Sequence, residues 1–164
     1  MTYTKQTLQQ DLAAMGLTGT ETILIHSSMK SIGAVEGGAD TVLDALMEFF
    51  AEGLLLLPTH TWRFINEENQ MFDVRRSPCC VGILPELFRQ RPGVVRSLHP
   101  THSMAAYGKD AAGAQQNIWQ GNWKTTPPAP PVAATTVYGR SAERSCCWAS
   151  AMPGTPSFTA WRRC

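Results

Sequence analysis

The first part of the chain alternates between the hydrophobic patterns of helices and strands. Leu8, Leu12 and Met15 recur at helical spacing behind Thr4, a good N-cap residue, and Gly16 is placed to end that helix. The run Thr-Ile-Leu-Ile-His at 22–26 predicts a short buried strand. Residues 27–33, which are polar and contain a glycine, are expected to form a loop after that strand.

A second helix and strand follow in the same order. Asp40 is expected to open an amphipathic helix, which Gly53 should end; its apolar face carries Val42, Leu43, Leu46, Met47 and Phe50. The run at 54–57 predicts another buried strand, ending at Pro58. Strand, loop, helix and strand in this order are typical of a βαβ unit. The chain is therefore predicted to be an α/β protein with a mixed, partly parallel sheet and flanking helices.

The pattern changes twice further along the chain. Residues 59–80 are irregular and polar, and a loop of that length is either functional or disordered. A short helix is expected at 82–90, strands at 94–95 and 103–107, and a further helix at 109–119. Beyond Lys124 prolines and small residues follow no period. We therefore expect a domain at 1–124 and an irregular C-terminal tail at 125–164.

Composition excludes several classes of partner. The chain has 164 residues and a net charge of +1, which gives no electrostatic argument for nucleic acid or a membrane. The N-terminus lacks the pattern of a signal peptide, and the longest apolar run, 54–57, is too short to span a bilayer. A cytoplasmic location is expected. The five cysteines lack CxxC spacing, which favours free thiols and no metal site.

Ligands of open α/β sheets bind where strands end, so the loops after the predicted strands are candidate sites. After the first strand, hydroxyls, a lysine and backbone N–H groups could hold phosphates or a pantetheine arm; plain connecting structure is the alternative. These residues are Ser27, Ser28, Lys30, Ser31 and Gly33. The segment lacks the GxxxxGK[ST] spacing of a P-loop.

Two later loops are weaker candidates. Trp62 precedes Glu67, Glu68 and Asp73, and carboxylates beside an indole suit a polycationic ligand, although these residues alone favour a solvated loop. His99 and His102 lie three apart on a non-helical segment without a nearby carboxylate or cysteine. A structural or substrate-facing role is expected for them rather than metal binding.

Taken together, the segments at 25–42, 57–62, 82–88 and 91–106 resemble, in order and spacing, the aminoglycoside 3-N-acetyltransferases. The resemblance implies an α/β fold and transfer of acetyl from acetyl-CoA to the 3-amino group of 2-deoxystreptamine antibiotics, which confers antibiotic resistance. It implies no metal and leaves a homodimer open. It places along the CoA site Ser27, Ser28, Lys30, Ser31, Gly33, His102, Ser103, Met104 and Ala105. The loop that carries Trp62, Glu67, Glu68 and Asp73 would face the cationic sugar.

The resemblance ends after Lys124, where the family continues with a pattern like Leu-Gly-Val-Gly-His-x-x-Asn-Thr. Joining the last base of each codon to the first two of the next permits that pattern at every junction and forces it at some: Cys147–Trp148 forces Leu, and Trp148–Ala149 forces Gly. The tail is therefore expected to be out of frame. Phe158 then stands over the histidine that serves the family as base, so this chain has no catalytic residue of its own and should be impaired. A catalytically inactive CoA-binding remnant and a non-functional fragment are the alternatives.

Overall fold

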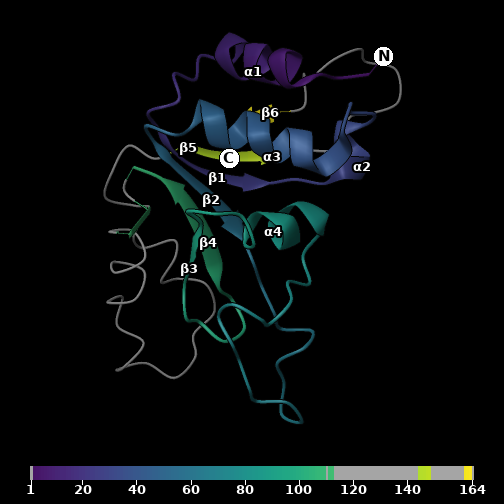
Figure 1. Ribbon diagram of the computed structural model, residues 1–164, viewed down its shortest axis with the longest axis vertical. Helices are drawn as coiled ribbons and strands as arrows, with labels where there is room; N and C mark the ends of the chain where they lie inside the picture. The colour runs from purple at the N-terminus through teal and green to yellow at the C-terminus, as the bar shows by residue number, and fades with distance from the viewer. Residues whose placement is uncertain (1, 110, 113–143, 149–160, 164) are drawn as a thin grey trace.

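Strands β1 (Thr22–His26) and β2 (Leu54–Pro58) lie side by side and parallel, as the βαβ pattern predicted. The computed structural model describes residues 2–109, 111, 112, 144–148 and 161–163 (Figure 1). Within these residues the sheet has the order β3-β4-β2-β1-β5-β6. Strand β4 (Met104–Gly108) runs antiparallel to β2, and the short β3 (Val95–Arg96) runs antiparallel to β4. The predicted mixed, partly parallel sheet is confirmed.

Helices α1 (Lys5–Ala14), α3 (Gly38–Phe49) and α4 (Ile83–Phe88) were all expected from the sequence. Thr4 caps α1 in a capping box with Thr7, in which each side chain bonds the other residue's backbone N–H. Helix α3 begins at Gly38 rather than at Asp40, because Gly37 takes the left-handed conformation that turns the chain into the helix. Asp40 lies in its first turn, where a carboxylate is favourable.

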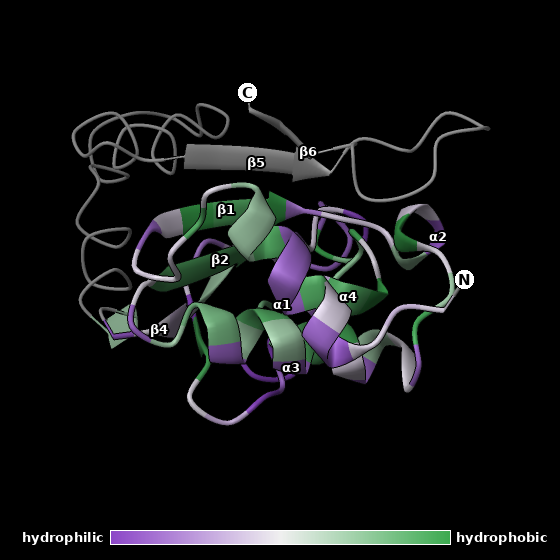
Figure 2. Ribbon diagram, turned by 90° about the horizontal axis from the view of Figure 1, so that it is seen from above, coloured by the Kyte–Doolittle hydropathy of each residue, from purple (hydrophilic) through white to green (hydrophobic). Residues whose placement is uncertain are grey.

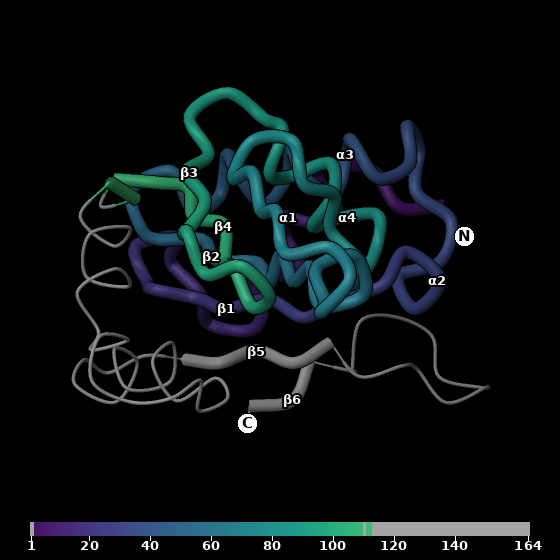
Figure 3. The backbone as a smooth tube through the Cα atoms, turned by 90° about the horizontal axis from the view of Figure 1, so that it is seen from below, coloured from purple at the N-terminus to yellow at the C-terminus, as the bar shows by residue number. Residues whose placement is uncertain are grey.

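The core lies between one face of the sheet and the helices. Alternate strand residues, among them Ile23, Ile25, Leu55 and Leu57, are fully buried against a cluster supplied by α1, α3 and α4. Figure 2 shows these helices on one side of β1 and β2, and Figure 3 shows the same layering from below. The other face carries a smaller cluster around Leu56, in which Ala106 and Ala111 are the other buried members.

Two local predictions differ from the structure. The loop predicted at 27–33 contains a one-turn helix, α2 (Met29–Ile32), because the Ser28 carbonyl accepts hydrogen bonds from the Ser31 and Ile32 amides. The strand predicted at 94–95 is displaced by one residue, to Val95–Arg96. The helix predicted at 109–119 lies largely outside the described residues.

Two short strands lie within the region predicted as an irregular tail. Strand β5 (Arg144–Trp148) pairs in parallel with β1, and β6 (Trp161–Arg163) pairs antiparallel with β5. Strand pairing is made by backbone groups, so the open edge of β1 can accept a segment whose side-chain pattern does not predict a strand. The rest of the 125–164 region lies outside the described residues.

Candidate functional site

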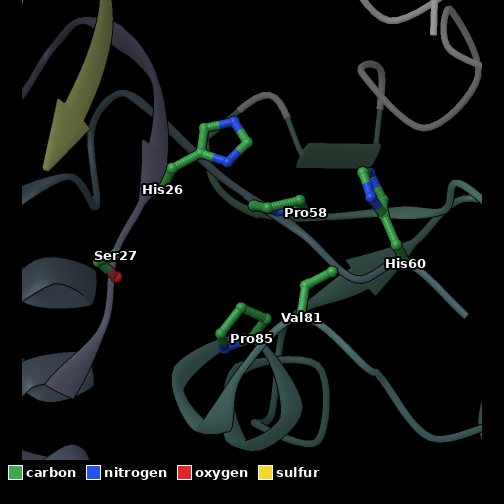
Figure 4. Close-up of a pocket in the computed structure, with 6 residues that line it drawn as sticks. All are labelled: His26, Ser27, Pro58, His60, Val81 and Pro85. Atoms are coloured by element: carbon green, nitrogen blue, oxygen red, sulfur yellow. The ribbon is translucent and has the colours of Figure 1, made fainter. Parts of the chain in front are cut away.

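A pocket opens at the edge of the sheet where β1 and β2 end. Parallel strands bring their carboxyl ends to the same edge, and β4 begins there because Met104 pairs with Pro58. A cavity of about 180 Å³ lies at this edge (Figure 4). Its lining comes from the ends of both strands and from the start of the α4 region: His26, Ser27, Pro58, His60, Val81 and Pro85. The position agrees with the general rule that open α/β sheets bind ligands beyond the carboxyl ends of their strands.

Ser27 supplies an unusual polar group to this pocket. Its Oγ is buried and has no hydrogen-bond partner among the described residues. Figure 4 shows the hydroxyl turned toward the side of the pocket where Pro85 lies. A buried hydroxyl without a partner costs about 1–3 kcal/mol, so a bound group that bonds it would recover that free energy. Ser27 is also the only member of the predicted CoA set that lines the cavity.

The other predicted residues after β1 lie beside the pocket rather than in it. Ser28 is extended and exposed at the start of α2, and Lys30 is exposed on that helix. Gly33 follows with φ of 94° and ψ of −153°, a conformation that side chains rarely adopt. The segment therefore presents exposed polar groups next to the cavity, with a backbone turn that requires glycine.

Three histidines gather at the far side of the pocket. The rings of His60 and His102 are 5.0 Å apart between centroids, and those of His99 and His102 are 5.5 Å apart. Burial, with the neighbouring His102, His26 and His99, lowers the pKa of His60 to about 4. Burial also lowers the pKa values of His26, at the rim, and of His99. The His60 imidazole is therefore neutral at pH 7 and presents an acceptor nitrogen.

The four histidines do not form a metal site in the geometry observed. No group of three or more His, Cys, Asp or Glu side chains in the described part of the chain is arranged to hold a metal ion. His99 Nδ1 instead accepts a hydrogen bond from the His102 amide at 2.9 Å, and Thr101 Oγ1 lies 2.9 Å from His102 Nδ1. These bonds stabilise the turn between β3 and β4.

Three residues of the predicted CoA set are buried inside the protein. Ser103, Met104 and Ala105 are at most 5% exposed, and Ser103 Oγ donates to the Thr59 carbonyl at 2.7 Å. Their side chains pack and bond within the fold. His102 is closer to solvent, in the histidine cluster. A role for these residues in CoA binding stays a prediction.

The residues predicted to face a cationic sugar lie on the long loop after β2. Trp62 is 51% exposed, and Glu67 and Glu68 are exposed as well. The Asp73 carboxylate already accepts hydrogen bonds from the Arg75 and Arg76 amides, and these bonds lower its pKa. None of the four lines the cavity. Their role toward a cationic ligand also stays a prediction.

Sequence reasoning missed Arg96, which bonds Thr59 between the pocket residues Pro58 and His60. Its side chain is 5% exposed, and its guanidinium donates to the Thr59 carbonyl at 2.8 Å and to the Ser77 carbonyl at 2.6 Å. Burial lowers the pKa of Arg96 to about 10, which leaves it charged at pH 7. A lone arginine at the end of a predicted strand was the only signal in the sequence.

Among the described residues no helix is both long and apolar enough to cross a membrane.

The pocket is partly polar and lies beyond the ends of the parallel strands of an α/β sheet. These features are typical of proteins that bind small molecules. The family model described as aminoglycoside 3-N-acetyltransferase matches residues 24–120, a range that contains this pocket. The chain belongs to that family.

The relatives are longer than the segment that matches them. An aminoglycoside N(3')-acetyltransferase-like protein, YokD, from Bacillus subtilis is 35% identical over 65% of this chain and 47% of its own length. Aminoglycoside N(3)-acetyltransferase VII from Streptomyces paromomycinus is also 35% identical, over 66% of this chain and 44% of its own. The chain thus spans about half the length of the curated relatives it matches.

Solved structures show the same fold. The crystal structure of YokD from Bacillus subtilis has a TM-score of 0.74 and 28% identity, over 90% of this chain and 60% of that one. AAC-VIa bound to sisomicin has a TM-score of 0.71 and 26% identity, over 90% and 59%. AAC-IIIb with CoASH has a TM-score of 0.66 over 90% and 60%, at 23% identity, which shows the fold alone.

Proposed function

We propose that this chain is the N-terminal part of an aminoglycoside 3-N-acetyltransferase. The whole protein would transfer acetyl from acetyl-CoA to the 3-amino group of 2-deoxystreptamine antibiotics and so confer resistance. The observation that carries the proposal is the pocket at the ends of β1 and β2, with its buried Ser27 hydroxyl, inside the segment that the family model matches. Sisomicin, the ligand bound in one structural relative, supports the acceptor substrate.

The cofactor side of the site is assigned to the segment after β1. Ser27, Ser28, Lys30 and Ser31 offer hydroxyls and one cation, and Gly33 gives the turn beyond them. The exposed ammonium of Lys30 suits a phosphate, and the Ser27 hydroxyl suits a polar atom of the pantetheine arm or thioester. His102 to Ala105 would border the same site through the start of β4. No metal is needed for these contacts.

The acceptor side is assigned to the loop after β2. Trp62 offers an exposed indole, and Glu67 and Glu68 offer exposed carboxylates to a polycation. Asp73 would contribute more weakly, because two backbone amides already bond its carboxylate.

The reaction needs a base, a role that the resemblance gives to a histidine beyond the matched part of this chain. A base removes a proton from the antibiotic amine while the amine nitrogen attacks the thioester carbonyl; the C–S bond then breaks and CoA leaves as its thiol. N–H donors stabilise the intermediate oxyanion. We propose that residues 125–164 are read out of frame, which puts Phe158 where the family has its histidine. The end of the family match at residue 120 supports this proposal.

A catalytically inactive CoA-binding remnant is the second candidate. It is favoured because the pocket and the predicted CoA residues lie in the part of the chain that matches the family. Phe158, at the proposed position of the base, lies outside that part. The free thiols of Cys79 and Cys80 suit a cytoplasmic location, where disulfides are rare. The homodimer stays a prediction, which light scattering would check.

Two measurements on purified protein separate these candidates. Calorimetry with CoA should detect binding by the chain as given. Release of CoA thiol from acetyl-CoA and kanamycin should be about a hundred- to ten-thousand-fold slower than for a version with its reading frame restored, since that is the usual contribution of a general base. Equal turnover by both would overturn the assignment of the tail. Absence of CoA binding by the restored version would overturn the proposed function.

A further inference from the structure

The loop between β2 and α4, residues 59–80, is fixed at its base and exposed at its tip. At its base, the Cys80 amide donates to the His60 carbonyl at 2.8 Å, which brings the two ends of the loop together. At its tip, Asn66 Oδ1 accepts from the Glu68 and Asn69 amides, so these contacts are local. In Figure 1 this loop extends beyond the end of the sheet, past β3 and β4. The placement of the loop therefore depends on what holds its base.

Arg96 holds that base from the neighbouring strand. Nη2 donates to the Thr59 carbonyl at 2.8 Å, and Nη1 donates to the carbonyls of Val74 at 3.2 Å and Ser77 at 2.6 Å. Nε lies 3.2 Å from Thr59 Oγ1 and 3.0 Å from Ser103 Oγ. One side chain thus joins the start of the loop, its returning arm and the start of β4.

A ring from the loop completes the contact. The Phe72 ring centroid lies 5.2 Å from the Arg96 guanidinium carbon, a cation–π distance. The planar guanidinium presents five N–H donors in a fixed fork, so it specifies where several carbonyls must lie. A lysine could satisfy only part of this set, because its three donors radiate from a single atom.

We propose that Arg96 is a positioning residue for the acceptor side of the site: by fixing Thr59, Val74 and Ser77 it places the 59–80 loop and holds His60, at the start of that loop, against the pocket. The inference deepens the proposed function and rests on it for the identity of the ligand, an aminoglycoside. Arg96 itself is buried and acts through the loop. Its loss should weaken acceptor binding while the CoA segment after β1 is unaffected.

The experiment compares Arg96→Lys and Arg96→Met with Arg91→Met in the full chain. Arg91 is a matched control, because it is also partly buried and pairs with Asp40 and Asp44 of α3, away from the loop. Amide hydrogen exchange by mass spectrometry follows residues 60–79, and calorimetry measures the affinities for kanamycin and for CoA. Phe72→Leu loosens the same contact from the loop side and serves if Arg96→Met does not fold.

We expect Arg96→Met to speed exchange across 60–79 and to weaken kanamycin binding by about tenfold or more. CoA affinity should fall by a clearly smaller factor, since the Arg96 side chain bonds mainly the 59–80 loop and reaches the predicted CoA set at Ser103. Arg96→Lys should fall between Arg96→Met and the parent, and Arg91→Met should leave loop exchange unchanged. Exchange that rises evenly over the whole chain, or kanamycin and CoA affinities that fall together, would overturn the proposal.

The two hypotheses fail in different ways. If the parent chain binds CoA but no kanamycin, the acceptor assignment of the proposed function fails for this chain, and Arg96 is then judged on exchange alone. Unchanged exchange over 60–79 in both Arg96 variants and in Phe72→Leu would overturn the role of Arg96 whatever the parent binds.

Discussion

At the scale of single residues, two polar side chains of the pocket lining, Ser27 and His60, are the strongest candidates to contact a ligand. The Ser27 hydroxyl is buried without a partner among the described residues, and burial keeps His60 neutral on the opposite side of the pocket. Both side chains are polar groups in the pocket lining that could bond a ligand. Such groups are typical of ligand sites, because they lower the stability of the free protein and gain a partner when a ligand binds.

Ser27→Ala tests this view of the pocket. Removing a buried hydroxyl that lacks a partner should leave the free energy of unfolding unchanged or raise it by up to about 1 kcal/mol, whereas CoA affinity should fall. Urea denaturation and calorimetry measure the two effects. Ser28→Ala, at an exposed neighbour, is the control for stability. A clear loss of stability in Ser27→Ala would mean that the hydroxyl is already satisfied inside the protein.

At the scale of elements, the parallel pair β1 and β2 does most to create the site. The crossover through α3 brings the two strand ends together, and the antiparallel β4 adds its first residues at the same edge. The open side of β1 is paired with β5 through four residue pairs, Ile23 with Arg144 to His26 with Cys147. An uncovered strand edge is a template for pairing with other chains, so β5 has a protective role in this sheet.

A chain ending at residue 124 should therefore self-associate. Without β5 the β1 edge is exposed, and we expect concentration-dependent oligomers and a lower urea midpoint than for the full chain. Analytical ultracentrifugation over a range of concentrations measures the first effect. A chain ending at residue 148 keeps β5 without β6 and should stay closer to the parent. Monomeric behaviour of the 1–124 chain, with unchanged stability, would show that β5 does not protect β1.

At the scale of the whole molecule, stability should depend on pH through the histidines at the pocket edge. The pKa of His60 is lowered to about 4, so the folded state favours its neutral form. This contribution to stability is complete above pH 6.5 and is lost as the pH falls from 6.5 toward 4. His26 and His99, whose pKa values are also lowered, add in the same direction.

His60→Asn should remove part of this acid sensitivity. Between pH 7.5 and pH 5 we expect the parent to lose about 1 kcal/mol more stability than the variant, after allowance for the partial exposure of the ring. Urea denaturation at the two pH values measures the difference. Carboxylates such as Glu86, with a lowered pKa, affect both proteins equally and cancel. Equal pH dependence in parent and variant would contradict the burial of a neutral His60.

The sequence by itself determined most of the elements and the edge of the sheet where the candidate site lies. Regular periods and local caps marked α1, β1, α3 and β2, because helix and strand preferences act over neighbouring residues. The parallel pairing of β1 and β2 followed from the crossover, and it placed Ser27 and His60 at one edge.

Only the tertiary structure decided which side chains meet there. Arg96 contacts Thr59 across 37 positions of sequence, and Val81 and Pro85 complete the pocket from the far end of the long loop. The pairing of β5 with β1 also depends on backbone groups far apart in the chain. Contacts of this kind leave no local period, because they are fixed by the packing of distant segments rather than by neighbouring residues.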